Sequence, residues 1–86
     1  MKVHVGSVLY EYTGGRAEVE ANGATVSAVL DDLERRFPGL RFRVIDEQGR
    51  IRPHMRVFAG GAPVADLRAP LGEKGEVHVL GALSGG

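Results

Sequence analysis

The chain has 86 residues, a length that supports one folded domain with a single small core. Its 11 basic side chains balance its 11 acidic ones, which argues against the basic surface of most nucleic-acid-binding domains. It contains no cysteine, so disulfides, thiolate metal sites and a thiol nucleophile are excluded. No apolar run approaches the length of a membrane span and the first residues lack a signal-peptide pattern, so we expect a cytoplasmic protein without a membrane partner.

The N-terminal segment has the pattern of two β-strands joined through a glycine-rich turn. Apolar and polar residues alternate over 1–5 and again over 16–21. The inward-facing residues of the second run are expected to be Ala17, Val19 and Ala21. A turn is expected at 13–15, whereas the stretch 8–12 favours neither helix nor strand. An antiparallel hairpin is the expected arrangement.

Residues 25–37 predict an amphipathic helix. Thr25 follows a turn at Asn22 and Gly23 and is suited to cap the helix N-terminus. The apolar residues recur at helical spacing and form one stripe, made of Val26, Val29, Leu30, Leu33 and Phe37. Pro38 and Gly39 are expected to end the helix.

The C-terminal half reads as further extended segments separated by turns. These segments are expected at 40–45, 51–59, 62–65 and 76–80. Turns are expected at 46–49 and at 60–61, where two glycines stand together. Leu67 and Leu71 are expected to tuck under the sheet.

The order of the expected elements predicts an α+β roll that forms a single domain over 1–86. In this roll, a mixed sheet of four or five strands carries the main helix on one face. The chain reverses through the helix, so the first and last strands should be parallel neighbours. A flexible tail is expected from about 81 to 86.

The tail is made of small residues and ends in Gly85 and Gly86. Glycine loses the most backbone entropy on ordering, so we expect this end to be mobile and to present its α-carboxylate on a thin stalk. An enzyme with a narrow channel could admit the stalk, because two glycines bring no side chains to clash. From the dipeptide alone, a frayed terminus or a cloning scar remains the better explanation.

Four side chains are expected on the outward face of the sheet. His4 and His78 should be adjacent there, but no third ligand is evident, so we predict surface histidines and no metal site. Phe58 and Leu80 fall out of phase with the buried residues of their strands and are expected to be exposed. Large exposed apolar side chains on a sheet are typical of a partner surface, although a small protein also cannot hide all of them.

No arrangement in the sequence predicts catalysis. We find no Ser-His-Asp order with supporting turns, no phosphate loop and no paired carboxylates of a cleft. One run of arginines is interleaved with acidic residues and lacks an aromatic platform, so an acidic partner surface or a solvated face is expected rather than nucleic acid. These arginines are Arg41, Arg43, Arg50, Arg52 and Arg56.

Five stretches, in this order and with the terminal glycines, resemble a known family. They are Leu9–Gly15, Gly23–Val26, Arg36–Leu40, Asp46–His54 and Leu80–Gly86. The family is that of the ubiquitin-like sulfur carriers, the MoaD/ThiS family, and the long loop and the chain length favour its MoaD-like branch. The resemblance implies a β-grasp fold. The pair at 60–61 departs from the family, in which a polar residue usually precedes the turn glycine.

The resemblance also implies a mechanism. A ubiquitin-activating-type enzyme would adenylate the carboxylate of Gly86, next to Gly85, and a sulfur donor would displace AMP to leave a thiocarboxylate. The chain would bind no cofactor, because ATP would be consumed by the partner. It would be a protein co-substrate rather than an enzyme, or the small sulfur-carrying subunit of a synthase. The surface for this partner and for a sulfur-accepting enzyme is expected at Phe58, Leu80 and Leu83.

Two alternative functions and the identity of the sulfur acceptor stay open. The chain could be a ubiquitin-like modifier conjugated to lysines, or a non-catalytic binding or regulatory subunit with an inert tail. Carriers of this family serve the biosynthesis of molybdenum cofactor, cysteine and thiamine and the thiolation of tRNA, and the sequence does not name the acceptor.

Overall fold

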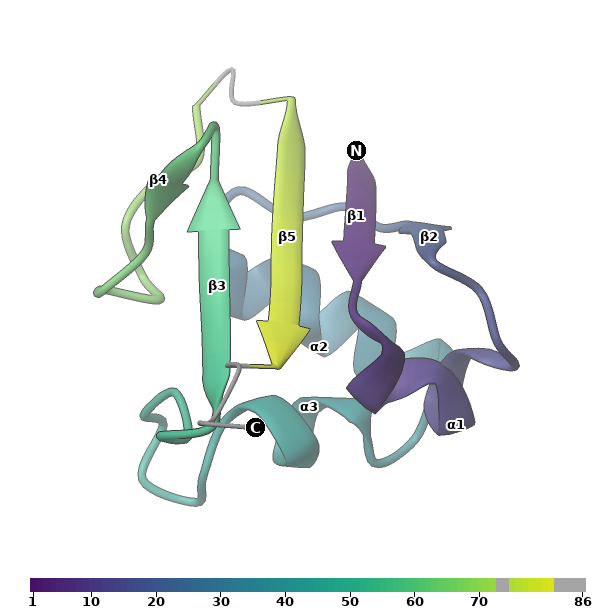
Figure 1. Ribbon diagram of the computed structural model, residues 1–86. Helices are drawn as coiled ribbons and strands as arrows, with labels where there is room; N and C mark the ends of the chain where they lie inside the picture. Colours follow the sequence, from purple (N-terminus) through teal and green to yellow (C-terminus); the bar gives the residue numbers. More distant parts are fainter. Residues whose placement is uncertain (73–74, 82–86) are drawn as a thin grey trace.

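The computed structural model describes residues 1–72 and 75–81 and contains a five-stranded mixed sheet in the order β2-β1-β5-β3-β4 (Figure 1). The strands are β1 (Lys2–Val5), β2 (Glu18–Glu20), β3 (Met55–Ala59), β4 (Ala62–Pro63) and β5 (Glu76–Gly81). The helices are η1 (Ser7–Leu9), α1 (Tyr10–Thr13), α2 (Val26–Arg36) and α3 (Leu40–Val44). None of the helices in the described part of the chain is long and apolar enough to cross a bilayer.

The first and last strands lie side by side and parallel at the centre of the sheet, as predicted. Val3 pairs with Val77 and His4 pairs with His78. β2 joins the other edge of β1, and β3 joins the other edge of β5, both in antiparallel pairing. The predicted α+β roll with a mixed sheet is therefore confirmed.

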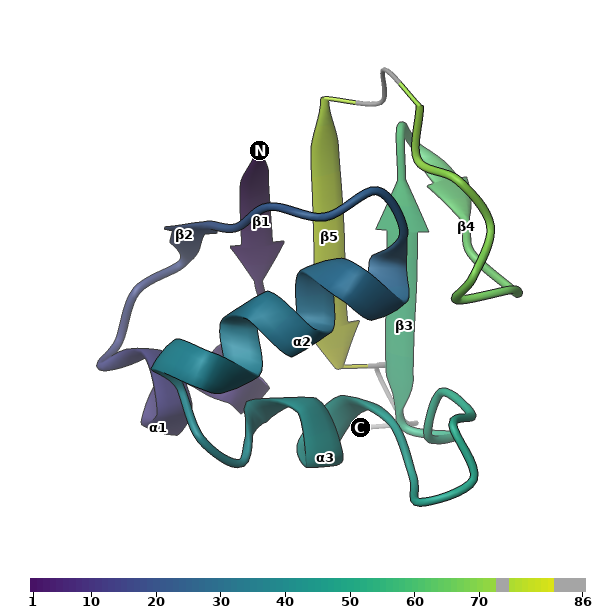
Figure 2. The ribbon, with the colours of Figure 1, turned by 180° about the vertical axis from the view of Figure 1, so that it is seen from behind.

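Helix α2 crosses one face of the sheet (Figure 2), and no helix of residues 1–72 and 75–81 lies over the opposite face (Figure 1). Four residues of its predicted stripe are buried, with 1% or less of each residue exposed at Val26, Val29, Leu30 and Leu33. The fifth, Phe37, is the C-cap beyond the end of the helix and is only partly buried. This stripe belongs to one core cluster together with inward-facing strand residues, namely Val3, Met55, Val57, Val77 and Val79. The predicted cap is also present, since the hydroxyl oxygen of Thr25 accepts the Ala28 N–H at 3.1 Å.

The segment 40–45 is helical, so the predicted extended conformation is wrong. Gly39 reverses the chain after α2 with a φ of 96°, and the Glu34 carboxylate accepts the Gly39 N–H at 2.9 Å. Leu40 and Val44 are then one helical turn apart and both buried. Their spacing satisfies a strand and a helix equally well, and the contact with α2 decides between them.

Several other boundaries differ from the expected ones. Ala17 is exposed because β2 begins only at Glu18, and the long strand begins at Met55 rather than at Ile51. The ambiguous stretch 8–12 is helical, divided between η1 and α1. The turn at 60–61 forms as predicted, with both glycines at positive φ, and β4 after it is shorter than expected. The predicted burial of two leucines is confirmed at Leu67 and Leu71.

Gly23 provides a test of how closely the chain approaches α2. A Cβ atom at this position would lie 2.6 Å from the backbone nitrogen of Val29 and 2.8 Å from the carbonyl carbon of Ala28. Backbone atoms of a helix cannot yield as a side chain does, so Gly23→Ala should lower the free energy of unfolding by about 1–3 kcal/mol. Urea denaturation measures this change.

The matched control is Gly75→Ala, because a Cβ at Gly75 would have no atom within 4 Å and needs no unusual backbone angle. This variant should stay within about 0.5 kcal/mol of the parent protein. Equal losses in the two variants would contradict the close approach at Gly23.

Candidate functional site

The face of the sheet opposite α2 carries the candidate site. The strand register places four side chains in one row across four strands, in the order Glu18, His4, His78 and Phe58. Alternate residues of a strand point to the same face, so Glu76 and Leu80 of β5 lie on the same side as His78. Figure 1 looks onto this face, with α2 behind the sheet.

The two histidines form a compact cluster with a carboxylate. The rings of His4 and His78 stack with their centroids 4.3 Å apart and their planes 15° from parallel. Oε1 of Glu76 lies 2.5 Å from Nε2 of His4 and 3.6 Å from Nε2 of His78. The hydrogen bond with His4 is the main cause that holds the pKa of the Glu76 carboxyl below its usual value.

The predicted adjacency of the histidines is confirmed, but the statement that no third ligand group is evident is wrong. Glu76 stands two residues before His78 on the same strand and therefore on the same face. The spacing of two residues between Glu76 and His78 was the signal in the sequence. It indicates a third ligand for the histidine pair only when β1 and β5 are known to be paired.

Phe58 and Leu80 lie on the expected face, but both are half-buried, so the predicted exposure is wrong. Phe58 is flanked in register by His78 on one side and Pro63 on the other. The side chain of Leu80 lies close to Gly6: a Cβ atom added to Gly6 would be 3.5 Å from Cδ2 of Leu80. Neighbours on adjacent strands cover part of each side chain, which periodicity within one strand cannot reveal.

The large apolar residue that is exposed in the described part of the chain is Phe42 of α3, at 58%. The exposure of Phe42 was not predicted from the sequence, because the segment 40–45 was expected to be extended. Arg52 lies over its ring, with the guanidinium carbon 4.5 Å from the ring centroid.

β5 continues to Gly81, so the predicted start of the tail at this residue is corrected. Gly81 pairs with Met55 of β3, and a Cβ at Gly81 would lie 3.2 Å from a methyl group of Val8. The segment that leads to the chain end therefore departs from a position fixed between β3 and η1. The predicted site residues Leu83, Gly85 and Gly86 lie outside the described residues.

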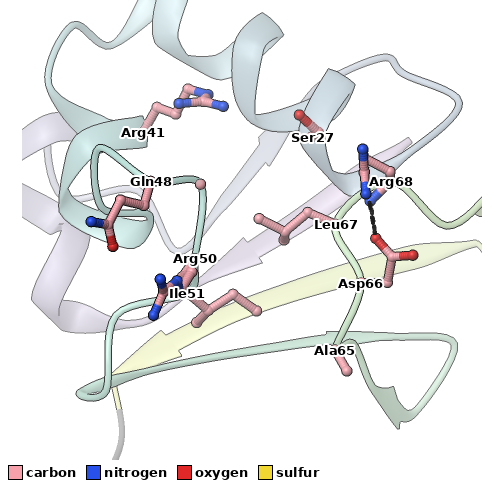
Figure 3. A pocket seen from close by; sticks show the side chains of 10 residues that line it. Ser27, Arg41, Gln48, Arg50, Ile51, Ala65, Asp66, Leu67 and Arg68 are labelled. Carbon is pink, nitrogen blue, oxygen red and sulfur yellow. Dashed lines mark hydrogen bonds and ion pairs between the residues drawn. The ribbon is translucent and has the colours of Figure 1, made fainter.

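A separate open cavity of about 760 Å³ lies between α2, α3 and two loops (Figure 3). Three arginines line it, namely Arg41, Arg50 and Arg68. Nε of Arg41 lies 2.7 Å from a carboxylate oxygen of Asp31, and Nε of Arg68 lies 4.0 Å from one of Asp66. Two of the three arginines that line the cavity thus have acidic neighbours, so the cavity does not offer a uniform anion site.

No known family model matches the chain. The chain is similar to the sulfur carrier protein CysO of Mycobacterium tuberculosis, with 28% identity over 89 residues that cover 98% of this chain and 96% of that protein. The crystal structure of M. tuberculosis CysO has a TM-score of 0.87 at 26% identity and covers 95% of this chain and 98% of that chain.

Two further structures have the same arrangement. CysO in the BexX/CysO complex of Amycolatopsis orientalis has a TM-score of 0.88 at 31% identity, over 99% of this chain and 98% of that chain. SAMP1 of Haloferax volcanii has a TM-score of 0.75 at 31% identity, over 100% of this chain and 98% of that chain. The predicted ubiquitin-like β-grasp fold is confirmed by these likenesses.

Proposed function

Because this chain belongs to the ubiquitin-like β-grasp sulfur carriers of the MoaD/ThiS type, we propose that it carries sulfur as a thiocarboxylate on Gly86. The observation that carries the proposal is the full-length similarity to CysO, described as a sulfur carrier protein. The two glycines at the chain end and the absence of cysteine support it, because the transported sulfur then has no side-chain thiol to occupy.

The proposed chemistry begins with a partner enzyme that activates the chain end. A carboxylate oxygen of Gly86 attacks the α-phosphorus of ATP and pyrophosphate leaves, which converts a poor electrophile into an acyl-adenylate. A sulfur donor then attacks the acyl carbon and AMP leaves, giving the thiocarboxylate. In this scheme ATP is consumed on the partner, and the chain acts as a co-substrate that holds no catalytic group.

Partner enzymes are part of the proposal. The crystal structure of a BexX/CysO complex holds a carrier of this fold together with a second protein, which supports docking of this chain onto an enzyme. We propose an adenylating enzyme of the ubiquitin-activating type and a second, sulfur-accepting enzyme. The acceptor pathway stays open among molybdenum cofactor, cysteine, thiamine and tRNA thiolation.

A second candidate function is that of a protein modifier joined to lysines. The likeness to SAMP1, described as a small archaeal modifier protein, favours this candidate. Both functions begin with activation of the chain end and differ in the nucleophile that follows. Lysine-linked conjugates of this chain in its own cells would support the modifier.

The test of the carrier function is incubation with the cognate activating enzyme, ATP and a sulfide source. We expect the intact mass to rise by the exchange of one oxygen for one sulfur. A thiol-specific reagent should label the product, and since the chain has no cysteine, the label must report the thiocarboxylate. An unchanged mass with an active enzyme would overturn the proposal.

The partner surface makes a further prediction at Phe58. Phe58→Asp should slow adenylation or sulfur delivery by about tenfold or more, because it places a carboxylate in an apolar contact that docking would desolvate. The rate of pyrophosphate release at varied carrier concentration measures this effect. Some loss of stability is expected because Phe58 is half-buried.

Phe42→Asp is the matched control, since it introduces the same charge at an exposed phenylalanine on α3. Docking through the outer face of the sheet predicts nearly unchanged kinetics for this variant. A partner surface at Phe58 is contradicted if both variants lose activity equally, or if Phe58→Asp has no kinetic effect.

A further inference from the structure

Within residues 1–72 and 75–81, one group of three metal-ligating side chains has its ligand atoms within 4.8 Å of one another. The group consists of His4, Glu76 and His78. We propose that these side chains bind a divalent transition-metal ion of the zinc type on the outer face of the sheet, with water completing its coordination. This site is independent of Gly86, so its failure would leave sulfur carriage untouched.

The three donors match the chemistry of such an ion. Zinc accepts imidazole nitrogens and carboxylate oxygens, and three protein ligands with one water are a common set. Imidazole also suits the neighbouring divalent ions copper and nickel, so the site defines a class of metals, of which zinc is the one to test. Without cysteine in the chain, no thiolate site competes for zinc.

The backbone brings the three residues together. His4 and His78 are directly paired on the parallel strands β1 and β5, and Glu76 stands two residues earlier on β5. Both strands lie at the centre of the sheet and are held by ladders on both sides. The backbone hydrogen bonds of the central strands therefore fix the Cα positions of the three ligands.

One of the two distances from the Glu76 oxygen to the ring nitrogens is close to that of a metal site, and the other is too short. Two ligands of a tetrahedral zinc ion are about 3.4 Å apart, given bonds of about 2.0–2.1 Å. Oε1 of Glu76 is 3.6 Å from Nε2 of His78 and 2.5 Å from Nε2 of His4. The shorter contact would open by about 1 Å when a metal ion replaces the proton in it.

Ring orientation is the adjustment that binding requires. The stacked rings lie 15° from parallel, so their in-plane lone pairs do not converge on one point. Rotation about the Cβ–Cγ bond of each histidine tilts the lone pairs toward Glu76. This torsion has a broad energy profile, and both side chains are partly open to solvent, so the rotation has room to occur.

A second carboxylate, that of Glu18, lies next to His4 on the neighbouring strand β2. Oε1 of Glu18 on β2 lies 3.5 Å from Nδ1 of His4, and the Lys2 ammonium lies 3.8 Å from the other oxygen of Glu18. Histidines that bind a metal usually donate their other ring N–H to a carboxylate, which fixes the tautomer. A small approach of Glu18 from its present 3.5 Å would let it accept the Nδ1–H of His4 and leave Nε2 free for the ion.

The test is titration of zinc into the metal-free protein, prepared without a polyhistidine tag and with its ordinary carboxylate end, followed by calorimetry. We expect one ion per chain. His4→Ala and His78→Ala should each weaken binding by more than about tenfold, and Glu18→Ala by about tenfold. His54→Ala is the matched control, because the third histidine of the chain is exposed and lies outside the cluster.

Two further readouts distinguish metal binding from a structural role. The ring nitrogen signals of His4 and His78, but not of His54, should shift in NMR spectra on zinc addition. Zinc should raise the melting temperature of the parent protein and of His54→Ala, but not of His78→Ala. Should a histidine variant fail to fold, Glu76→Gln tests the same site at an exposed position.

The proposal is overturned if the parent protein takes up no zinc. It is equally overturned if both His4→Ala and His78→Ala bind as the parent does, or if binding is lost in His54→Ala instead.

Discussion

Deletion of Gly86 is expected to abolish sulfur loading while leaving the melting temperature nearly unchanged. The deletion withdraws the terminal carboxylate by about 3.3–3.6 Å, the length of one extended residue. A displacement of about 1 Å from the reacting geometry already costs about a hundredfold in rate. The buried core residues of the described part of the chain all lie at or before Val79, so the deletion removes none of them. Intact mass after incubation with the activating enzyme, ATP and sulfide reports the loading.

Two further variants separate reach from chemistry. Adding one glycine after Gly86 displaces the carboxylate in the opposite direction and should also abolish loading. Gly86→Ala keeps the length and adds one methyl group, so its effect should be milder. If the shortened chain still acquires sulfur, then the chain end is not the site and the carrier proposal falls.

Leu33→Ala is expected to lower the stability of the protein strongly. Leu33 is fully buried in the cluster between α2 and the sheet. Removal of a buried leucine side chain costs about 2–5 kcal/mol, because transfer free energy is lost and a cavity remains. For a domain of this size the melting temperature should fall by about 10 °C or more. Thermal and urea denaturation both measure the change.

Phe42→Ala is the control for this prediction, since it removes a larger side chain that is 58% exposed. Its contact with Arg52 contributes no more than about 1 kcal/mol at an exposed site. A loss as large as that of Leu33→Ala would contradict the assigned position of the core.

The elements that the sequence alone predicted are those in which the alternation or helical spacing of apolar residues extends over a long continuous segment. The apolar stripe of α2 extends over three turns with a cap at Thr25, and its periodicity fits no other structure. The strands β1 and β5 alternate cleanly, and the chain reversal through α2 then implied their parallel pairing. The resemblance over the whole chain led to the hypothesis that Gly86 is the site of sulfur loading. That proposed role requires a terminal carboxylate and no packing contact.

The tertiary structure alone decided the features that depend on contacts between distant residues. The pattern over 40–45 is too short to separate helix from strand, and the contact of α3 with Glu34 settled it. The partial burial of Phe58 follows from its neighbours on two adjacent strands. Glu76 joined His4 only through the register of β1 with β5, a pairing across 72 residues. Register is set by packing of the whole sheet on α2, so no local stretch of sequence contains it.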